Sequence, residues 1–340
     1  MTDSPVILST GAITPGGCGA TGFDPIRWTS FPIAALDGAG PVFDVYRIPE
    51  KAAALERWRR EPRLRRCSQL TIHLVEAASQ ALAARPDIDR SRVGVVGAFF
   101  IGCLVSSIRF YRELVRQGRR FASPIIFPET VFNSPLSHLA ATLGVGGPIY
   151  TQIGDKSAWV TALRTAECWL RRGAADHVLV LGGEEFESHI LEVYRRARWL
   201  GPTRGFYPAE GAGAVLLGRN EGQTKDPIQI GLLRDGYGFR TRKEATAATE
   251  ACLQPIGTGE AVMPTAGALW TRKLERAAFT AHQWQRIPVE PLPGEAFPAS
   301  AAWDTIRAAE WLIQARESRV TIPVWGPSQQ VSALQLCRGS

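Results

Sequence analysis

The sequence predicts an α/β protein, and three observations lead to this prediction. Residues 133–186 alternate helical and extended periodicity, in the order helix, strand, tight turn, helix and strand, which is the pattern of α/β folds. The chain has 340 residues, of which 45% are apolar, enough for one large core or two fused cores. Its six cysteines are scattered without a C-x-x-C pair, so we expect reduced thiols and no disulfide framework.

Before residue 133, four elements follow from local patterns. An apolar run turns at Pro15–Gly17, an amphipathic stretch is closed off by Arg85–Pro86, and the segment RVGVVGA is typical of a buried strand. In chain order these patterns predict a strand, a helix, a strand and a helix over residues 5–9, 68–84, 92–98 and 104–117.

Residues 133–186 centre on a strand, a turn and a long helix. Gly154 and Asp155 make a sharp turn, and from Lys156 onward apolar residues recur at three- and four-residue steps, as on a core helix. Two arginines and Gly173 end this helix, with basic groups near its negative pole and a glycine free to take positive φ. The stretch predicts helix, strand, helix and strand over residues 135–143, 148–153, 156–172 and 177–181. Downstream, the patterns predict a helix, a strand, a helix and a closing hairpin over residues 187–198, 228–233, 301–315 and 323–334.

Residues 147–163, GPIYTQIGDKSAWVTAL, match without a gap a segment that reads approximately G-P-x-x-T-x-x-T-A-C-S-S-S-x-x-A-L. That segment carries the nucleophile of the β-ketoacyl synthases, thiolase-fold enzymes that extend fatty acids and polyketides on an acyl carrier protein, and this chain resembles them. Further family phrases follow at residues 173–176, 182–184 and 205–217. The resemblance implies a thiolase-like five-layered α/β/α/β/α fold built from two related halves, residues 1–220 and a shortened half, 221–340.

The catalytic positions of that family carry other residues here. Lys156 stands at the cysteine that holds the acyl chain. Ile256 aligns with the histidine of H-G-T-G-T, while Glu290 and Glu295 align with the lysine and the histidine of K-x-x-x-G-H. Condensation needs a thiolate nucleophile and two imidazoles that donate hydrogen bonds to the developing enolate. An amide on Lys156 would not turn over, and neither replacement for a histidine serves as donor, so we expect no catalysis.

The former nucleophile pocket is predicted to contain Asp155, Ser157, Pro327 and Ser328. A lysine at a helix N-terminus faces the positive end of the helix dipole, so it must lose its proton or find a carboxylate. Asp155 is adjacent, but our hypothesis is that Lys156 forms an ion pair with Glu295 and so fills the site. The alternative is that Lys156 points into a solvated channel.

Much of the basic excess behind the net charge of +7 lies in two arginine clusters. Such runs are often only solvated helix faces, and no nucleic-acid motif accompanies them. The resemblance favours an acidic acyl carrier protein as partner, since complementary charge speeds encounter and fixes docking. The predicted docking residues are Arg57, Arg59, Arg60, Arg63, Arg65 and Arg66, with Arg116, Arg119 and Arg120.

Residues 123–133, SPIIFPETVFN, resemble the segment that leads into the dimer-forming region of ketosynthases. The resemblance implies a dimer face that includes Ile125, Ile126, Phe127, Phe132, Ile149 and Thr151. A ketosynthase without catalytic residues is similar to the chain length factors of type II polyketide systems, including the aryl polyene pathways. Those proteins pair with an active ketosynthase and help to shape its acyl tunnel. We therefore predict a non-catalytic subunit whose partners are an active β-ketoacyl-ACP synthase and an acyl carrier protein.

Two other functions stay open at this point. Lys156 in an apolar pocket could serve as a Schiff-base nucleophile or a general base, and the third possibility is a self-associating scaffold or regulatory binding protein. We expect no cofactor, and the five histidines show no metal-ligand spacing. No run of 18 apolar residues and no signal segment occurs, so we expect a cytoplasmic protein.

Overall fold

Two consecutive sets of strands build the centre of the molecule. The structure is a computed structural model that describes residues 4–339 apart from 35–41, 202–204, 221–225 and 254–259. The first set comprises β1 (Val6–Thr14), β5 (Val93–Phe99), β6 (Ile149–Ile153), β7 (His177–Glu184) and β8 (Gly211–Gly218). The second set comprises β9 (Ile228–Gly238), β10 (Ala261–Val262), β11 (Gln285–Arg286), β12 (Arg319–Gly326) and β13 (Gln330–Arg338).

Both sets have the same spatial order. The first runs β6-β5-β7-β8-β1 and the second β11-β10-β12-β13-β9, so each half, counted from its own first strand, reads 3-2-4-5-1. Val6 pairs with Gln229 and Ile7 with Ile228, which joins β1 to β9 and links the halves into one 11-stranded sheet. The short strand β2 (Gly17–Cys18) folds back on the end of β1. Two related halves would produce this repeated strand order. The repetition supports the predicted boundary at residue 220, but the boundary itself stays a prediction.

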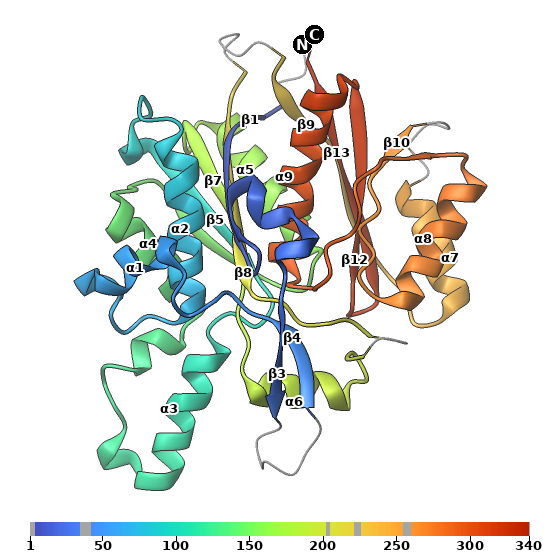
Figure 1. The fold of residues 1–340 in the computed structure, drawn as a ribbon. Coiled ribbons are helices and arrows are strands. Elements are labelled where there is room, and N and C mark those ends of the chain that lie inside the picture. Colours follow the sequence, from blue (N-terminus) through green and yellow to red (C-terminus); the bar gives the residue numbers. More distant parts are fainter. Residues whose placement is uncertain (1–3, 35–41, 202–204, 221–225, 254–259, 340) are drawn as a thin grey trace.

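Helices lie on both sides of each half and between the halves (Figure 1). α2 and α4 pack against the first set of strands, α7 packs against the second with α8 beside it, and α5 and α9 contact strands of both sets. The layers therefore read α/β/α/β/α, and the predicted fold class is confirmed. These helices are α2 (Gln69–Ala83), α4 (Ser134–Leu143), α5 (Ala158–Arg172), α7 (Arg242–Leu253), α8 (Leu269–Ala281) and α9 (Pro298–Ala315).

Two buried tryptophans fix the central helices α5 and α9 in place. Trp159 of α5 and Trp303 of α9 are fully buried. The Trp159 Nε1–H donates to Thr305 Oγ1 at 2.8 Å, and the Trp303 Nε1–H donates to the Ala212 carbonyl at 3.0 Å. An indole that removes about 200 Å² from water contributes roughly 5 kcal/mol as an upper bound. Because each ring also finds a polar partner, the start of each helix is held firmly at the centre of the molecule.

The remaining elements surround this core. The hairpin of β3 and β4 lies beside α6, and α3 projects away from the body (Figure 1). None of the helices in the described ranges is both long and apolar enough to cross a membrane. The peripheral elements are β3 (Ser30–Ala34), β4 (Val42–Tyr46), α1 (Ala53–Arg60), α3 (Leu104–Gln117), α6 (Ser188–Arg196), and the 3₁₀ helices η1 (Gly19–Phe23), η2 (Pro25–Arg27), η3 (Pro62–Leu64), η4 (Arg90–Arg92), η5 (Arg119–Phe121) and η6 (Phe127–Thr130).

Several element boundaries differ from the predictions because distant residues set them. The sequence predicts that the first strand ends near Ser9, but β1 continues to Thr14 because it pairs with β8 as far as Ile13. The strand predicted from residue 228 likewise extends to Gly238 through its pairing with β13. The pattern places the start of the central helix at Lys156, whereas α5 begins at Ala158.

Candidate functional site

The turn between β6 and α5 places Asp155 at the buried centre of the molecule. Its Oδ1 accepts a hydrogen bond from the Ser157 amide at 3.0 Å, a bond that fixes the turn just before α5. The hairpin between β12 and β13 supplies further donors: Gln330 Nε2 at 2.5 Å, the Ser328 amide at 3.3 Å and the Ser328 hydroxyl. All of these donors to the Asp155 carboxylate are neutral groups. The ammonium group of the adjacent Lys156 contacts other acceptors.

Lys156 is enclosed, and its ammonium group lies among acceptors from the second half of the chain. Only 2% of the side chain is exposed. Its Nζ lies 3.4 Å from Glu295 Oε2 and 3.3 Å from Asp304 Oδ2, and it donates to the Thr265 carbonyl at 3.3 Å. The ion pair hypothesised between Lys156 and Glu295 is therefore confirmed, and the alternative of a solvated channel is wrong.

The carboxylates that meet Lys156 belong to α9 and the residues just before it. Glu295 Oε1 accepts a hydrogen bond from the Phe297 amide at 2.8 Å, where the positive end of the helix dipole favours an anion. Asp304 lies on the buried face of α9, and its Oδ1 is 3.6 Å from Arg307 Nη1. Two cations and two carboxylates thus form one continuous buried cluster.

The surroundings of this cluster keep Lys156 charged. Burial alone lowers the pKa of Lys156, but the carboxylates of Glu295 and Asp304 outweigh burial, and the net pKa is raised. Burial raises the pKa of both carboxyl groups, an effect that Lys156 opposes. An ammonium with a raised pKa holds its proton at neutral pH, so Lys156 has no free lone pair for nucleophilic attack.

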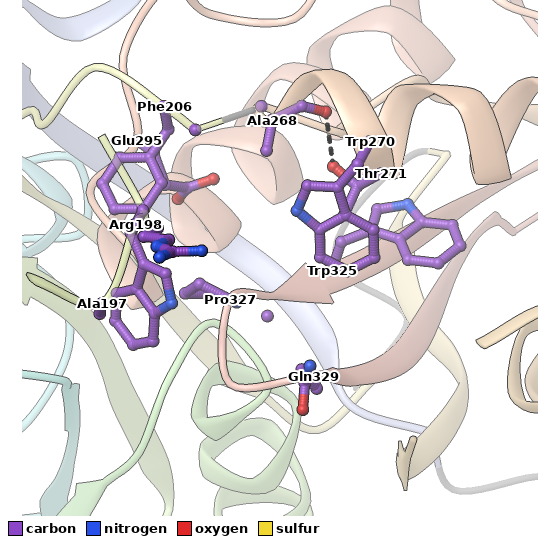
Figure 2. A pocket seen from close by; sticks show the side chains of 14 residues that line it. Ala197, Arg198, Phe206, Ala268, Trp270, Thr271, Glu295, Trp325, Pro327 and Gln329 are labelled. Carbon is purple, nitrogen blue, oxygen red and sulfur yellow. Dashed lines mark hydrogen bonds between the residues drawn. The ribbon is translucent and has the colours of Figure 1, made fainter. Parts of the chain in front are cut away.

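A small cavity lies beside the ion cluster. It has a volume of about 220 Å³, and Figure 2 shows the Glu295 carboxyl group on one side with Trp270 and Trp325 across from it. Its lining residues are Ala197, Arg198, Trp199, Gly205, Phe206, Gly267, Ala268, Trp270, Thr271, Glu295, Trp325, Gly326, Pro327 and Gln329. No cysteine or histidine is among these described residues, so the cavity offers neither a thiolate nor an imidazole.

The predicted site residues divide into three groups. Lys156 pairs with Glu295, and Pro327 lines the cavity together with Glu295. Asp155 and Ser157 are buried on either side of Lys156 in the sequence, and Ser328 contacts Asp155. Ile256 lies outside the described residues.

The structure places Glu290 at the surface. The alignment puts this residue at the lysine of the second histidine motif, and its side chain is 74% exposed and lies 2.8 Å from Arg286. The two residues are four apart in sequence and hold each other at the surface. The motif therefore does not extend from Glu295 back to Glu290 in space.

Sequence reasoning missed three members of the cluster, namely Asp304, Arg307 and the Thr265 carbonyl. Asp304 had a signal, since it is the one charged residue on the mostly apolar stretch ASAAWDTI of a helix. An acid among buried positions is rare unless it is paired. The carbonyl of Thr265 had no such signal, because every residue has a backbone carbonyl group.

The predicted dimer-face residues lie on one side of the molecule that is rich in exposed apolar groups. Ile125, Phe127, Phe132 and Ile149 are 40–57% exposed, while Ile126 and Thr151 are half-buried. The prediction omitted Tyr150 and Ile153 on the same strand, which are 49% and 40% exposed. Most residues of this edge strand expose apolar side chains, instead of alternating as on a strand with one solvated face.

The arginine clusters lie on α1 and η3 and around the end of α3. Arg57 is bound by Glu76 at 2.8 Å and stacks on Trp58, and Arg59 and Arg60 approach Glu56. Within the described residues, no carboxylate lies within ion-pair distance of the other six, which are Arg63, Arg65, Arg66, Arg116, Arg119 and Arg120. These six carry the charge available to a partner.

Comparisons with known proteins agree with this geometry. A family model for the N-terminal domain of β-ketoacyl synthases matches residues 54–222. A β-ketoacyl-[acyl-carrier-protein] synthase III of Rhizorhabdus wittichii is 32% identical over 110 residues, which are 32% of this chain and 32% of that protein. The match thus spans about a third of the length of this curated relative.

Three solved structures resemble the chain over nearly its whole length. The ishigamide ketosynthase/chain length factor has a TM-score of 0.78 at 21% identity, covering 99% of this chain and 100% of that chain. A type II polyketide acyl carrier protein in complex with its ketosynthase, AntDE:AntF, has a TM-score of 0.75 at 17% identity, covering 99% of each chain. The ketosynthase ApeO in complex with its chain length factor ApeC, from Xenorhabdus doucetiae, has a TM-score of 0.73 at 14% identity, covering 99% of this chain and 98% of that chain.

Similarity at these identities establishes the shared fold, and the family model adds the match in sequence. The nucleophile turn lies inside the matched residues, with Lys156 in the place of its cysteine. Through residues 54–222, the chain belongs to the β-ketoacyl synthase family.

Proposed function

We propose that this chain is a non-catalytic ketosynthase-like subunit of the chain length factor type, which pairs with an active β-ketoacyl-ACP synthase and shapes its acyl tunnel. One observation carries the proposal. The position of the nucleophile is filled by Lys156, whose ammonium group is buried and bound by Glu295 and Asp304.

The chemistry of condensation indicates that this site does not catalyse the reaction. The acyl chain must be held as a thioester that forms and breaks with little driving force, which requires a thiolate. Two of the six cysteines, Cys103 and Cys252, are buried away from the cavity, and burial raises the pKa of each thiol to about 12. The charge at Glu295 would also oppose the negative charge of an enolate.

An exposed apolar face supports pairing with a second subunit. In the described part of the chain β6 pairs only with β5, so its other edge is open. Phe127 packs on Phe110 of α3 at 5.5 Å between ring centroids, and Phe132 and Ile153 both lie against Gly102. Neighbouring apolar groups of this kind on α3, η6 and β6 form a surface that a partner would cover. The ishigamide and Xenorhabdus structures both combine a ketosynthase with a chain length factor.

The six arginines without a carboxylate partner support docking of an acidic acyl carrier protein. They belong to η3 and the residues just after it, to the end of α3 and to η5, and electrostatic complementarity raises association rates. One of the similar structures, AntDE:AntF, contains an acyl carrier protein bound to a ketosynthase.

The alternative in which Lys156 is a Schiff-base nucleophile or a general base is disfavoured by its environment. Such a lysine needs a depressed pKa and access to substrate, whereas the pKa of Lys156 is raised and its side chain is 2% exposed. Borohydride reduction in the presence of a carbonyl substrate should therefore leave no adduct on Lys156.

Co-expression with an active β-ketoacyl-ACP synthase tests the proposal. We expect a one-to-one complex by native mass spectrometry, in which the partner alone carries acyl thioester. The substitution Tyr150→Asp places a charge on the open edge of β6 and should abolish the complex. Ile313→Asp changes another exposed apolar residue, on α9, which is 58% exposed against 49% for Tyr150, and should leave the complex intact.

Carbon–carbon bond formation by the isolated chain would contradict the proposal. So would a loaded thioester on any of its six cysteines during turnover, or a complex that survives Tyr150→Asp and is lost with Ile313→Asp.

A further inference from the structure

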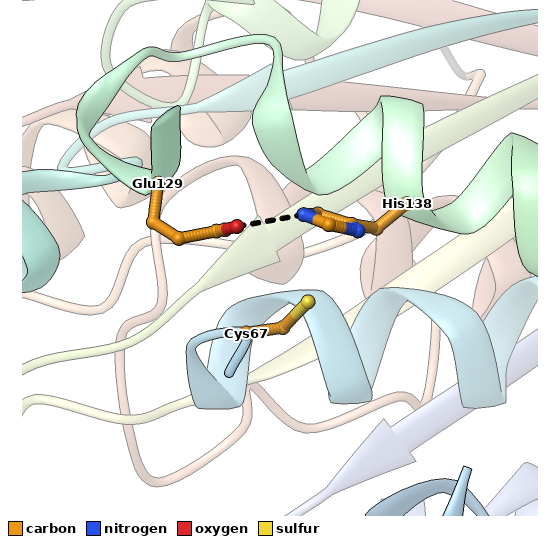
Figure 3. Close-up of side chains that lie close together, drawn as sticks. All are labelled: Cys67, Glu129 and His138. Carbon is orange, nitrogen blue, oxygen red and sulfur yellow. Dashed lines mark hydrogen bonds and ion pairs between the residues drawn. The ribbon is translucent and has the colours of Figure 1, made fainter. Parts of the chain in front are cut away.

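Three potential metal ligands from separate segments converge near the start of α2. Cys67 lies just before α2, Glu129 lies in η6 and His138 lies on α4. Of the residues that the structure describes, these form the group in which three ligand atoms of cysteine, histidine and acidic side chains come within 4.8 Å of one another. Figure 3 shows the carboxyl group of Glu129 directed at His138, with the Cys67 sulfur pointing toward both.

Contacts around the cluster hold two of the ligands in position. His138 Nε2 lies 2.9 Å from Glu129 Oε1, and Glu129 Oε2 accepts a hydrogen bond from Ser134 Oγ at 2.9 Å. The Cys67 thiol makes a long contact, 3.8 Å, with the carbonyl of Arg63, and it also hydrogen-bonds to the side chain of His138. The side chains of Glu129 and His138 are 12% and 30% exposed, so the cluster is partly shielded yet reachable from solvent.

The donor set determines which ion would fit. A thiolate sulfur, an imidazole nitrogen and a carboxylate oxygen together are ligands of zinc, whereas magnesium and calcium prefer oxygen alone. Three protein ligands with a fourth position open is the arrangement of zinc sites that keep a solvent or substrate ligand. We propose that Cys67, Glu129 and His138 bind one divalent ion of the zinc class, through Sγ, one carboxylate oxygen and Nε2.

Charge balance permits this site in a basic neighbourhood. The thiolate of Cys67 and the carboxylate of Glu129 cancel the two positive charges of the ion. Arg63, Arg65 and Arg66 line the adjoining pocket, and Arg63 directs its Nη1 to the Ala141 carbonyl at 2.6 Å. The remaining guanidinium charge favours an anionic or water ligand at the open position.

Loading the site releases protons. The Cys67 thiol gives up its proton to solvent, and so does the His138 Nε2–H that now faces Glu129, so that sulfur and nitrogen can each offer a lone pair to the ion. The bound ion would tie η6, which lies within the proposed dimer face, to the start of α2. The inference rests on these three side chains and is independent of the proposed function.

Metal binding by the purified full-length chain tests the site. After removal of metal with a chelator, we expect titration with zinc sulfate to show one equivalent bound by calorimetry and the Tm to rise with zinc concentration. Cobalt(II) should give the near-ultraviolet absorption of a thiolate-to-cobalt charge transfer. Both signals should be lost in Cys67→Ser and in His138→Gln.

Cys168→Ser is the matched control, since this half-exposed cysteine on α5 lies outside the cluster, and it should bind zinc as the unmodified protein does. If Cys67→Ser does not fold, as judged by circular dichroism, Glu129→Gln should lower zinc affinity at least tenfold. Absence of binding to the unmodified chain overturns the proposal, as does one full equivalent in a folded Cys67→Ser or His138→Gln variant.

Discussion

The two central helices, α5 and α9, occupy matching places in the two halves but begin with opposite charges. Each follows the third strand of its half, β6 or β11, and each contacts strands of both sets. Lys156 comes two residues before α5, and Glu295 three residues before α9. A carboxylate suits the positive end of a helix dipole and a lysine does not.

The contacts of Asp155 and Lys156 explain how the fold accommodates a lysine at this position. Just before α5, the Asp155 carboxylate accepts a hydrogen bond from the Ser157 amide. The turn is therefore stabilised without any contact from the lysine side chain. Its ammonium group crosses instead to the carboxylates of α9. The cation of one half is thus neutralised by the anions of the other, and the buried site depends on both halves.

Removing the cation should have the largest effect on stability. In Lys156→Met, the buried carboxylates of Glu295 and Asp304 lose their shared partner, so we expect the free energy of unfolding to fall by about 3–5 kcal/mol. Urea denaturation at pH 7 measures this change. The loss should be smaller at pH 5, because the buried carboxyl groups then take up protons in the folded state.

Lys51→Met is the control for this variant. Lys51 is exposed, so its substitution should change the free energy of unfolding by no more than about 0.5 kcal/mol. An equal effect of the two substitutions would mean that the ion cluster contributes nothing to stability.

A double-mutant cycle should sharpen the link between the two helices. Glu295→Gln alone leaves Lys156 with Asp304 and should cost about 2 kcal/mol. Combined with Lys156→Met, it leaves Asp304 next to Arg307, so the charges that remain are balanced. We expect the double variant to be more stable than the sum of the single effects by about 1–3 kcal/mol, as measured in urea. Additive effects would contradict coupling between the start of α5 and the start of α9.

The helix start at Asp155 can be tested without changing any charge. A Cβ at Gly326 would run into the Asp155 carboxylate, so Gly326→Ala should displace it and destabilise the protein by about 1–3 kcal/mol in thermal or urea unfolding. At Gly238, a Cβ would meet no heavy atom within 4 Å, and Gly238→Ala should be nearly neutral. Similar losses at both glycines would show that Asp155 is not the sensitive point.

Glu184 offers a contrast to Glu295, because among the described residues this buried acid forms no ion pair. Burial raises the pKa of Glu184 from near 4.5 to about 8, although the amides of Phe100 and Ile101 donate to it. The folded protein therefore holds a proton that the unfolded chain releases between about pH 4.5 and 8, and stability should fall as pH rises through this window. Glu184→Gln should flatten the profile by up to about 1.4 kcal/mol per pH unit, measured as the free energy of unfolding at several pH values.

Glu187→Gln is the companion variant for that experiment, since Glu187 is exposed. Its pH profile should match that of the unmodified protein, and an unchanged slope in Glu184→Gln would rule out this carboxyl group as the source of the pH dependence.

Local sequence patterns were enough to predict the strand, turn and helix around Lys156, the α/β class and the replacement of the family's cysteine. These features are local: helical and extended periodicity act within about ten residues, and a gapless motif fixes each position in it. The same reasoning predicted Glu295 as the partner of Lys156, because the motif that carries it could still be recognised.

The further contacts of these groups could be found only from the packing of the folded chain. Asp304 and Thr265 reach Lys156 from distant segments, Glu290 turns to the surface, and Cys67 approaches Glu129 and His138. Such contacts depend on how helices and strands pack. When two residues are many positions apart, the sequence does not indicate how close they lie in space. The start of each helix can be read from its neighbours along the chain, but the charge that balances it comes from the other half of the fold.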